Sequence, residues 1–149
     1  MRIDINSLDL FKKVLSRVLR KEINQNINGI SIDSRKIKKG DIFLCLQGQK
    51  NHGNDFINKE LLSKASFIIT DKEYISNKVF LVKDSKKFLA SLAMEFRINL
   101  KAKFIGITGT NGKTSTKELL VEFLKTKFRV SYSHQNYNST VSLPLSLLA

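Results

Sequence analysis

The sequence has few of the residues that mark disulfide-rich, collagen-like and low-complexity proteins. Its 149 residues include one cysteine, one proline, seven glycines and no tryptophan. Because Cys45 is alone, an internal disulfide and a zinc site made of several cysteines are both excluded. Cys45 lies in the apolar run 42–46, a setting that favours a buried and chemically inert thiol.

Long apolar runs are also missing. No stretch approaches the roughly 18 apolar residues that a helix needs to cross a bilayer. Residues 1–6 lack the basic flank and apolar segment of a signal peptide. We therefore expect a cytoplasmic protein that does not insert into membranes.

Acidic side chains are scarce as well. There are 13 aspartates and glutamates against 26 lysines and arginines, so the formal net charge is +13. A positive field attracts nucleotides and nucleic acids alike. The lysines are scattered along the chain, and no segment interleaves arginine with aromatic residues as RNA-binding motifs do. We expect a solvated, lysine-rich surface and no nucleic-acid partner; a basic nucleic-acid-binding module is the non-enzymatic alternative.

Short apolar runs do alternate with amphipathic segments. Apolar spacings of three and four residues predict helices, and short β-branched runs predict strands. The predicted order is helix 7–19, strands 30–32 and 42–46, helix 55–65, strands 67–69 and 79–82, helix 84–99, strand 104–108, helix 114–127, strand 129–132 and a final helix. Such alternation indicates an α/β fold with mainly parallel pairing.

Polar residues before these helices are the expected caps. They are Ser7, Asp55, Asp84 or Ser85, and Ser139 or Thr140. Pro144 is compatible with the final helix only if it lies in the first turn.

The alternation divides into two units. We expect residues 1–83 to form a small α/β domain, residues 84–102 a connecting helix and junction, and residues 103–149 the start of a parallel-sheet domain. In the helix 114–127 the Leu119–Leu120 and Phe123–Leu124 pairs are predicted to be buried. Two strands and two helices give the second unit only a thin core, so we expect it to be truncated.

The segment G-T-N-G-K-T at 109–114 follows a predicted strand and opens a predicted helix. Glycines let successive backbone N–H groups converge on an anion, and the helix N-terminus adds partial positive charge. We predict an ATP phosphate site with Mg²⁺, in which Lys113 and Thr114 are catalytic and the Thr114 hydroxyl binds the metal. The predicted nucleotide contacts are Gly109, Thr110, Asn111, Gly112, Lys113, Thr114 and Ser115.

The loop departs from the general phosphate-loop spacing. That pattern places a glycine five residues before Gly112, where this chain has Ile107. The match is therefore to a compact variant, and a generic phosphate-loop kinase or GTPase remains an alternative.

Three blocks resemble the Mur ligases, which build the peptide stem of bacterial peptidoglycan. Residues 106–118 resemble their ATP loop, residues 33–35 with 40–43 their D-S-R…G-D-x-F block, and residues 53–57 the block that follows. The resemblance implies that residues 1–83 hold the uridine-diphosphate end of the precursor, contacted by Ser34 and Arg35. It also implies ATP-dependent amide formation through an acyl phosphate.

Within the family, residues 116–118 and 136–145 are most similar to the member that adds D-alanyl-D-alanine to UDP-N-acetylmuramoyl-tripeptide. This implies substrate contacts from Asn136 and Asn138, a UDP-N-acetylmuramoyl-peptide and a dipeptide or amino acid as partners, and a monomer. The relative that adds the third stem residue is the runner-up. The family's later glutamate, carbamylated lysine and C-terminal domain have no counterpart here, so we expect the 149 residues alone to be inactive.

His52 and Asn54 stand where the family usually has Asp and His. A loop histidine is more often solvated than catalytic, and we expect His52 to be a solvated surface residue. His134, after a predicted strand, is expected at the surface for the same reason.

Overall fold

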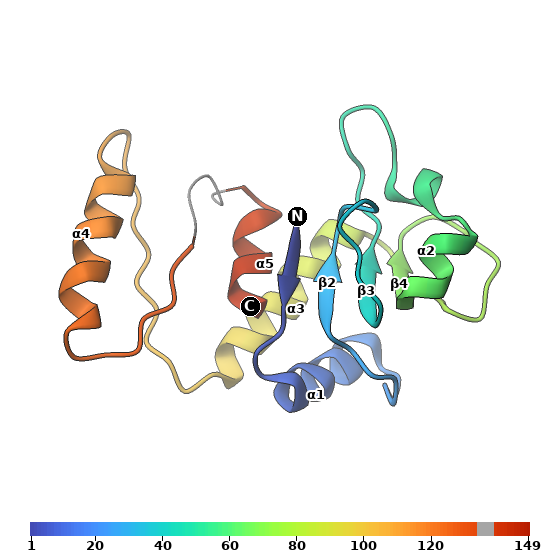
Figure 1. Cartoon of the computed structure of the whole chain (residues 1–149), viewed down its shortest axis with the longest axis horizontal. Helices are drawn as coiled ribbons and strands as arrows, with labels where there is room; N and C mark the ends of the chain where they lie inside the picture. Colours follow the sequence, from blue (N-terminus) through green and yellow to red (C-terminus); the bar gives the residue numbers. More distant parts are fainter. Residues whose placement is uncertain (134–138) are drawn as a thin grey trace.

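The computed structural model describes residues 1–133 and 139–149 and contains one five-stranded sheet (Figure 1). The strands lie in chain order: β1 (Arg2–Asp4), β2 (Gly29–Ser31), β3 (Asp41–Leu44), β4 (Ala65–Thr70) and β5 (Val79–Leu81). β1 runs antiparallel to β2, and the other pairs are parallel. The predicted mixed α/β fold with a mainly parallel sheet is confirmed.

Helices cover both faces of this sheet. The larger apolar core contains residues of α1 (Leu8–Leu19), α3 (Ser85–Asn99) and α5 (Ser142–Leu148) on one face. The shorter α2 (Lys59–Lys64) packs on the other. α4 (Lys113–Lys125) stands apart from the sheet and is joined to it by extended segments (Figure 1).

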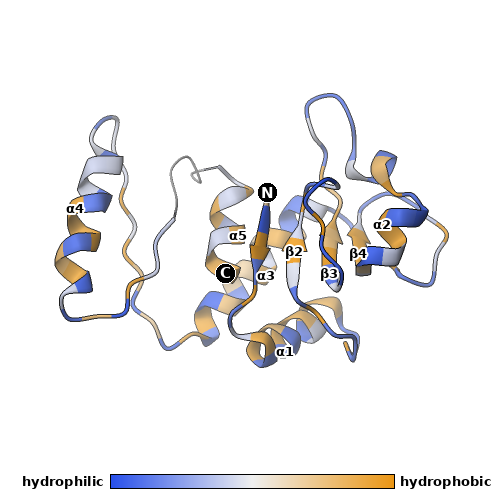
Figure 2. Cartoon of the chain, in the orientation of Figure 1, coloured by the Kyte–Doolittle hydropathy of each residue, from blue (hydrophilic) through white to orange (hydrophobic). Residues whose placement is uncertain are grey.

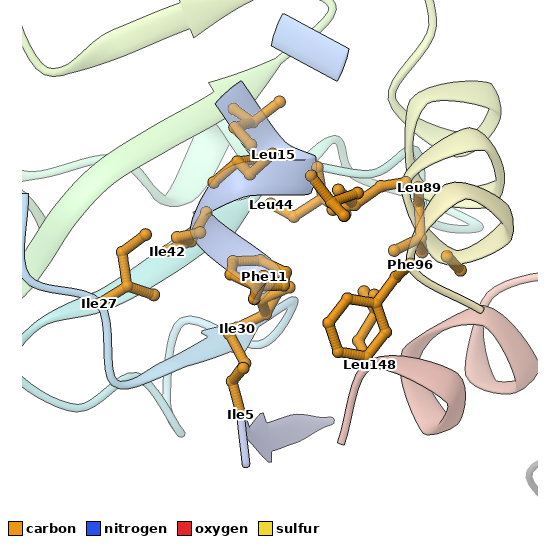
Figure 3. Close-up of a cluster of buried hydrophobic side chains, with 14 of the residues drawn as sticks. Ile5, Phe11, Leu15, Ile27, Ile30, Ile42, Leu44, Leu89, Phe96 and Leu148 are labelled. Atoms are coloured by element: carbon orange, nitrogen blue, oxygen red, sulfur yellow. The ribbon is translucent and has the colours of Figure 1, made fainter. Parts of the chain in front are cut away.

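Alternation along the strands assigns side chains to the two faces. In β3, Ile42 and Leu44 enter the larger core whereas Phe43 enters the smaller one. In the larger core Phe11 of α1 meets Phe96 of α3 edge to face, with ring centroids 6.1 Å apart (Figure 3). Each such fully buried side chain contributes about 1.5–3 kcal/mol through the hydrophobic effect.

The smaller core encloses Cys45, which has no exposed surface. Burial raises the pKa of its thiol to about 12. The predicted burial of Cys45 is confirmed. A neutral, inaccessible sulfur is a poor nucleophile, so the thiol is expected to be inert.

The predicted caps are only partly correct. Asp84 caps α3, with its Oδ1 accepting from the Lys87 N–H at 2.9 Å. Ser7 lies at the cap position of α1 but makes no side-chain cap bond. The cap at Asp55 was wrong: α2 starts at Lys59 behind Asn58, because Asp55 belongs to the 3-10 helix η1 (Gly53–Phe56).

The cap position of the final helix is Val141, which makes no side-chain cap bond, and not Ser139 or Thr140 as predicted. The Ser139 hydroxyl accepts from the Ser142 N–H at 3.0 Å, and Pro144 lies in the first turn as predicted. α5 packs against α3 and β1, and it buries Leu145 and Leu148 in the larger core (Figure 3).

Strand β1 was not predicted, since three residues with one apolar side chain give no periodic signal. It is fixed by a salt bridge that crosses β2. Arg2 donates from Nε and Nη2 to the two oxygens of the fully buried Asp41, at 2.7 and 2.9 Å. Gly29 lies between them, and a Cβ there would come within 2.3 Å of the Ile3 carbonyl. A side chain at this position would therefore force β1 away from β2.

The predicted strands 104–108 and 129–132 were wrong. Beyond β5, the residues that the structure describes contain no strand. A parallel strand needs hydrogen-bonded neighbours, and these segments lack them. For the same reason the α4 side chains predicted to be buried are not: Leu119 is 63% and Phe123 74% exposed, and apolar colour marks α4 in Figure 2.

In the part of the chain that the structure describes, no helix is both long enough and apolar enough to span a membrane.

Candidate functional site

The glycine-rich loop turns the chain from an extended segment into α4. Gly109 has φ +150° and Gly112 has φ +75°, values that side-chain-bearing residues rarely adopt. Gly112 occupies the cap position of α4, and its carbonyl accepts from the Thr116 N–H at 2.9 Å. The backbone therefore needs glycine at these two places.

Lys113 is the first residue of α4 and folds back over the loop. Its Nζ donates to the carbonyls of Gly109 and, at 3.2 Å, Thr110. Thr114 and Ser115 follow in the first turn and are exposed. One ammonium, two hydroxyls and the unpaired N–H groups that begin every helix thus meet at one end of α4, an arrangement that fits a phosphate.

The described ranges 1–133 and 139–149 hold no group of three or more His, Cys, Asp or Glu side chains placed to bind a metal ion. The Thr114 hydroxyl, predicted to bind Mg²⁺, is exposed in the first turn of α4. Asn136 and Asn138, predicted to contact substrate, and His134 lie outside the described residues.

The second predicted site follows β2. The Arg35 guanidinium donates from Nε and Nη2 to the two oxygens of Asp33, each at 3.0 Å. These bonds lower the pKa of Asp33 to about 2. The Arg35 side chain is 85% exposed and lies beside Ser34, so an anion can reach the guanidinium from solvent.

Ser34 and Arg35 open onto a cavity of about 360 Å³. Its other walls are Ile37, which precedes β3, and residues of η1, α2 and the link between them: Asp55, Phe56, Asn58, Glu60, Leu61 and Lys64. Phe56 is 44% exposed and offers an apolar surface. Ser34 and Arg35 were predicted as site residues from the sequence, whereas Phe56 was not.

His52 was predicted to be a solvated surface residue, but its side chain is buried and only 2% exposed. Its Nε2 lies 2.8 Å from Asp71 Oδ1, and its Nδ1 accepts from the Asn54 N–H at 3.1 Å. These partners replace water and allow the ring to be buried. Asp71 was missed, although its place two residues after the predicted strand 67–69 was an available signal.

Two family descriptions match successive parts of the chain. Residues 26–97 match "Mur ligase family, catalytic domain", and residues 107–149 match "Mur ligase middle domain". The chain belongs to the Mur ligase family. The glycine-rich loop lies at the start of the Mur ligase middle-domain match, and the Ser34–Arg35 cavity lies within the first.

Curated Mur ligases of two specificities are similar to the chain. The UDP-N-acetylmuramoyl-tripeptide–D-alanyl-D-alanine ligase of Rickettsia prowazekii is 40% identical over 140 residues, which is 91% of this chain and 31% of that protein. The UDP-N-acetylmuramoyl-L-alanyl-D-glutamate–2,6-diaminopimelate ligase of Clostridioides difficile is also 40% identical, over 107 residues, 69% of this chain and 22% of that protein.

Solved MurF structures share the fold. MurF ligase from Thermotoga maritima in complex with ADP is 38% identical with a TM-score of 0.74, covering 80% of this chain and 28% of that one. MurF from Acinetobacter baumannii is 26% identical with a TM-score of 0.82, covering 92% and 32%. The chain thus spans between 22% and 32% of the length of these Mur ligases.

Proposed function

We propose that the chain is the N-terminal portion of an ATP-dependent Mur ligase that adds D-alanyl-D-alanine to UDP-N-acetylmuramoyl-tripeptide. The observation that carries this proposal is the similarity to the Rickettsia D-alanyl-D-alanine ligase over 91% of the chain. The protein would act in the cytoplasm as a monomer, and 149 residues alone would not complete the ligation.

The proposal assigns a task to each part of the chain. Residues 1–83 bind the UDP-precursor, with Ser34 and Arg35 at the diphosphate and the cavity beside them for the remainder of the nucleotide. Residues 84–102 connect this domain to the next, and residues 103–149 begin the ATP-binding domain. The exposed apolar side chains of α4, such as Leu119 and Phe123, form the surface on which more of a middle domain packs.

Residues 109–115 hold the ATP phosphates. The Lys113 ammonium exchanges its two loop carbonyls for phosphate oxygens and stabilises the negative charge that develops on the transferred group. The Thr114 hydroxyl would help to hold Mg²⁺, which would supply further positive charge near the same group. Asn136 and Asn138 contact the substrate side of this site.

Calorimetric titration of the chain tests the proposal. We expect binding of UDP-N-acetylmuramoyl-tripeptide, weakened by Arg35→Ala but not by Lys113→Ala. MgATP binding should show the opposite dependence. Salt-sensitive DNA binding without affinity for either nucleotide would instead support the basic nucleic-acid-binding module.

The runner-up is the ligase that adds 2,6-diaminopimelate, favoured by the 40% identity to the Clostridioides enzyme. The UDP-precursor that this ligase extends carries a peptide one residue shorter than the tripeptide. Tighter binding of UDP-N-acetylmuramoyl-dipeptide than of the tripeptide by the same chain would favour this second function.

A further inference from the structure

His52 uses each ring nitrogen to bind a different part of the chain. The Nδ1 atom accepts from the Asn54 N–H at the start of η1, so the ring proton lies on Nε2. Nε2 therefore donates to Asp71 Oδ1, 2.8 Å away, just beyond β4. The ring links η1 to the carboxyl end of the sheet.

Asp71 extends the link to a third element. Its Oδ2 accepts from the N–H of Ser85, the first residue of α3, at 3.0 Å. Burial raises the pKa of Asp71, but the bonds from Ser85 and His52 lower it by more, and the net pKa lies below the usual value. The carboxylate thus stays charged and joins β4, α3 and the loop before η1.

The rest of η1 is held just as closely. The Asp55 carboxylate accepts from the His52 N–H at 2.9 Å, and the Asn54 side chain accepts from the Thr70 hydroxyl at 2.5 Å. Gly53 runs so close to β3 that an added Cβ would lie 2.5 Å from the Cα of Cys45. The position of η1 is therefore set by its contacts with His52, Thr70 and Cys45.

Two residues of η1, Asp55 and Phe56, line the same cavity as Ser34 and Arg35. The arginine can bind a diphosphate, and the half-exposed Phe56 ring offers a surface for a planar base. We propose that His52, through Asp71, is a positioning residue that holds Phe56 and Asp55 at the uridine-nucleotide cavity. This inference rests on the proposed function, since it concerns the same precursor site.

Two substitutions of similar size each remove one of the two hydrogen bonds made by the His52 ring. His52→Asn keeps an acceptor near the Nδ1 position and loses the bond to Asp71. His52→Gln keeps a donor near the Nε2 position and loses the bond to Asn54. We expect each to weaken binding of uridine 5′-diphosphate about tenfold, the effect of one such bond, and to leave MgATP affinity unchanged.

A double-mutant cycle shows whether His52 and Asp71 act together. Asp71→Asn should weaken UDP binding to a similar extent, and the double variant H52N/D71N should lose no more than either single variant. Leu15→Ala, in the core on the opposite face of the sheet, is the matched control: it should lower the urea midpoint without changing the UDP dissociation constant.

The measurements are calorimetric titrations at a temperature where circular dichroism shows every variant folded. If the His52 variants do not fold, hydrogen exchange in the wild-type chain replaces them, and saturating UDP should slow exchange of the Asn54 amide. Folded His52 variants with wild-type UDP affinity, or an Asn54 amide that UDP does not protect, would overturn the positioning role alone. A wild-type chain that does not bind UDP would overturn the proposed precursor site with it.

Discussion

Replacing Asp41 with alanine should remove the centre of the buried charge network that attaches β1 to the sheet. Asp41 has no exposed surface and accepts from Arg2 Nε at 2.7 Å, Arg2 Nη2 at 2.9 Å and the Lys38 N–H at 2.8 Å. Its loss leaves a guanidinium that is only 10% exposed without its main partner. Breaking a buried pair from one side costs about 3–5 kcal/mol.

Urea unfolding followed by far-ultraviolet circular dichroism measures this cost. With a denaturant dependence of about 2 kcal/mol per M, the midpoint should fall by roughly 2 M. The matched control is Asp4→Ala: Asp4 bonds the same guanidinium at 2.7 Å but is 74% exposed. An exposed partner contributes at most about 1 kcal/mol.

The same reasoning predicts the behaviour of a double variant. Replacing both partners with apolar residues, as in Arg2→Met with Asp41→Leu, leaves no buried charge unpaired. Its stability should return to within about 1 kcal/mol of wild type or exceed it. Equal costs for Asp41→Ala and Asp4→Ala would refute the view that burial, and not the presence of an ion pair, decides the energy.

Three further outcomes are expected. Gly112→Ala should cost about 1–2 kcal/mol at φ +75° and weaken MgATP binding by calorimetry, whereas Gly106→Ala, with open space around its Cβ, should leave affinity unchanged. The low pKa of Asp33 stabilises the folded state above about pH 4, and this stabilisation should be lost as the pH falls toward 2. In acid titrations followed by circular dichroism, Arg35→Ala should make stability depend less on pH. An unaltered profile would argue against the ion pair between Asp33 and Arg35. Cys45 should react with a thiol reagent only after urea unfolds the chain, so fast labelling of native protein would contradict its burial.

Apolar periodicity was enough to predict four of the five strands that share one sheet, all but β1. The run 42–46 became β3, and the 84–99 pattern became α3 with its Asp84 cap, because local preference and tertiary packing agree there. The strands at 104–108 and 129–132 show the opposite case. Their sequences are suited to a sheet, but a strand forms only where another supplies its hydrogen bonds.

Site residues that are close together in the sequence could be predicted, whereas contacts between residues far apart in the sequence could not. Gly109, Gly112 and Lys113 are neighbours in sequence, so their pattern could be read directly, although their roles remain predictions. The His52–Asp71 contact joins residues 19 positions apart, and nothing in either local sequence indicates the other. Histidine burial is decided by such distant partners, which is why the expectation of a solvated ring was wrong.

The return of α5 to the core has a consequence for chain connectivity. The polypeptide leaves the core at the end of α3 and re-enters it at Leu145 and Leu148, so the glycine-rich loop lies on an excursion anchored at both ends. A peptide-bond cut near Lys127 would then leave two fragments that stay together through α5. The distance that the glycine-rich loop can move from the sheet is limited by the length of the connecting segments. Its effective concentration near the sheet is therefore set by the fold and not by diffusion.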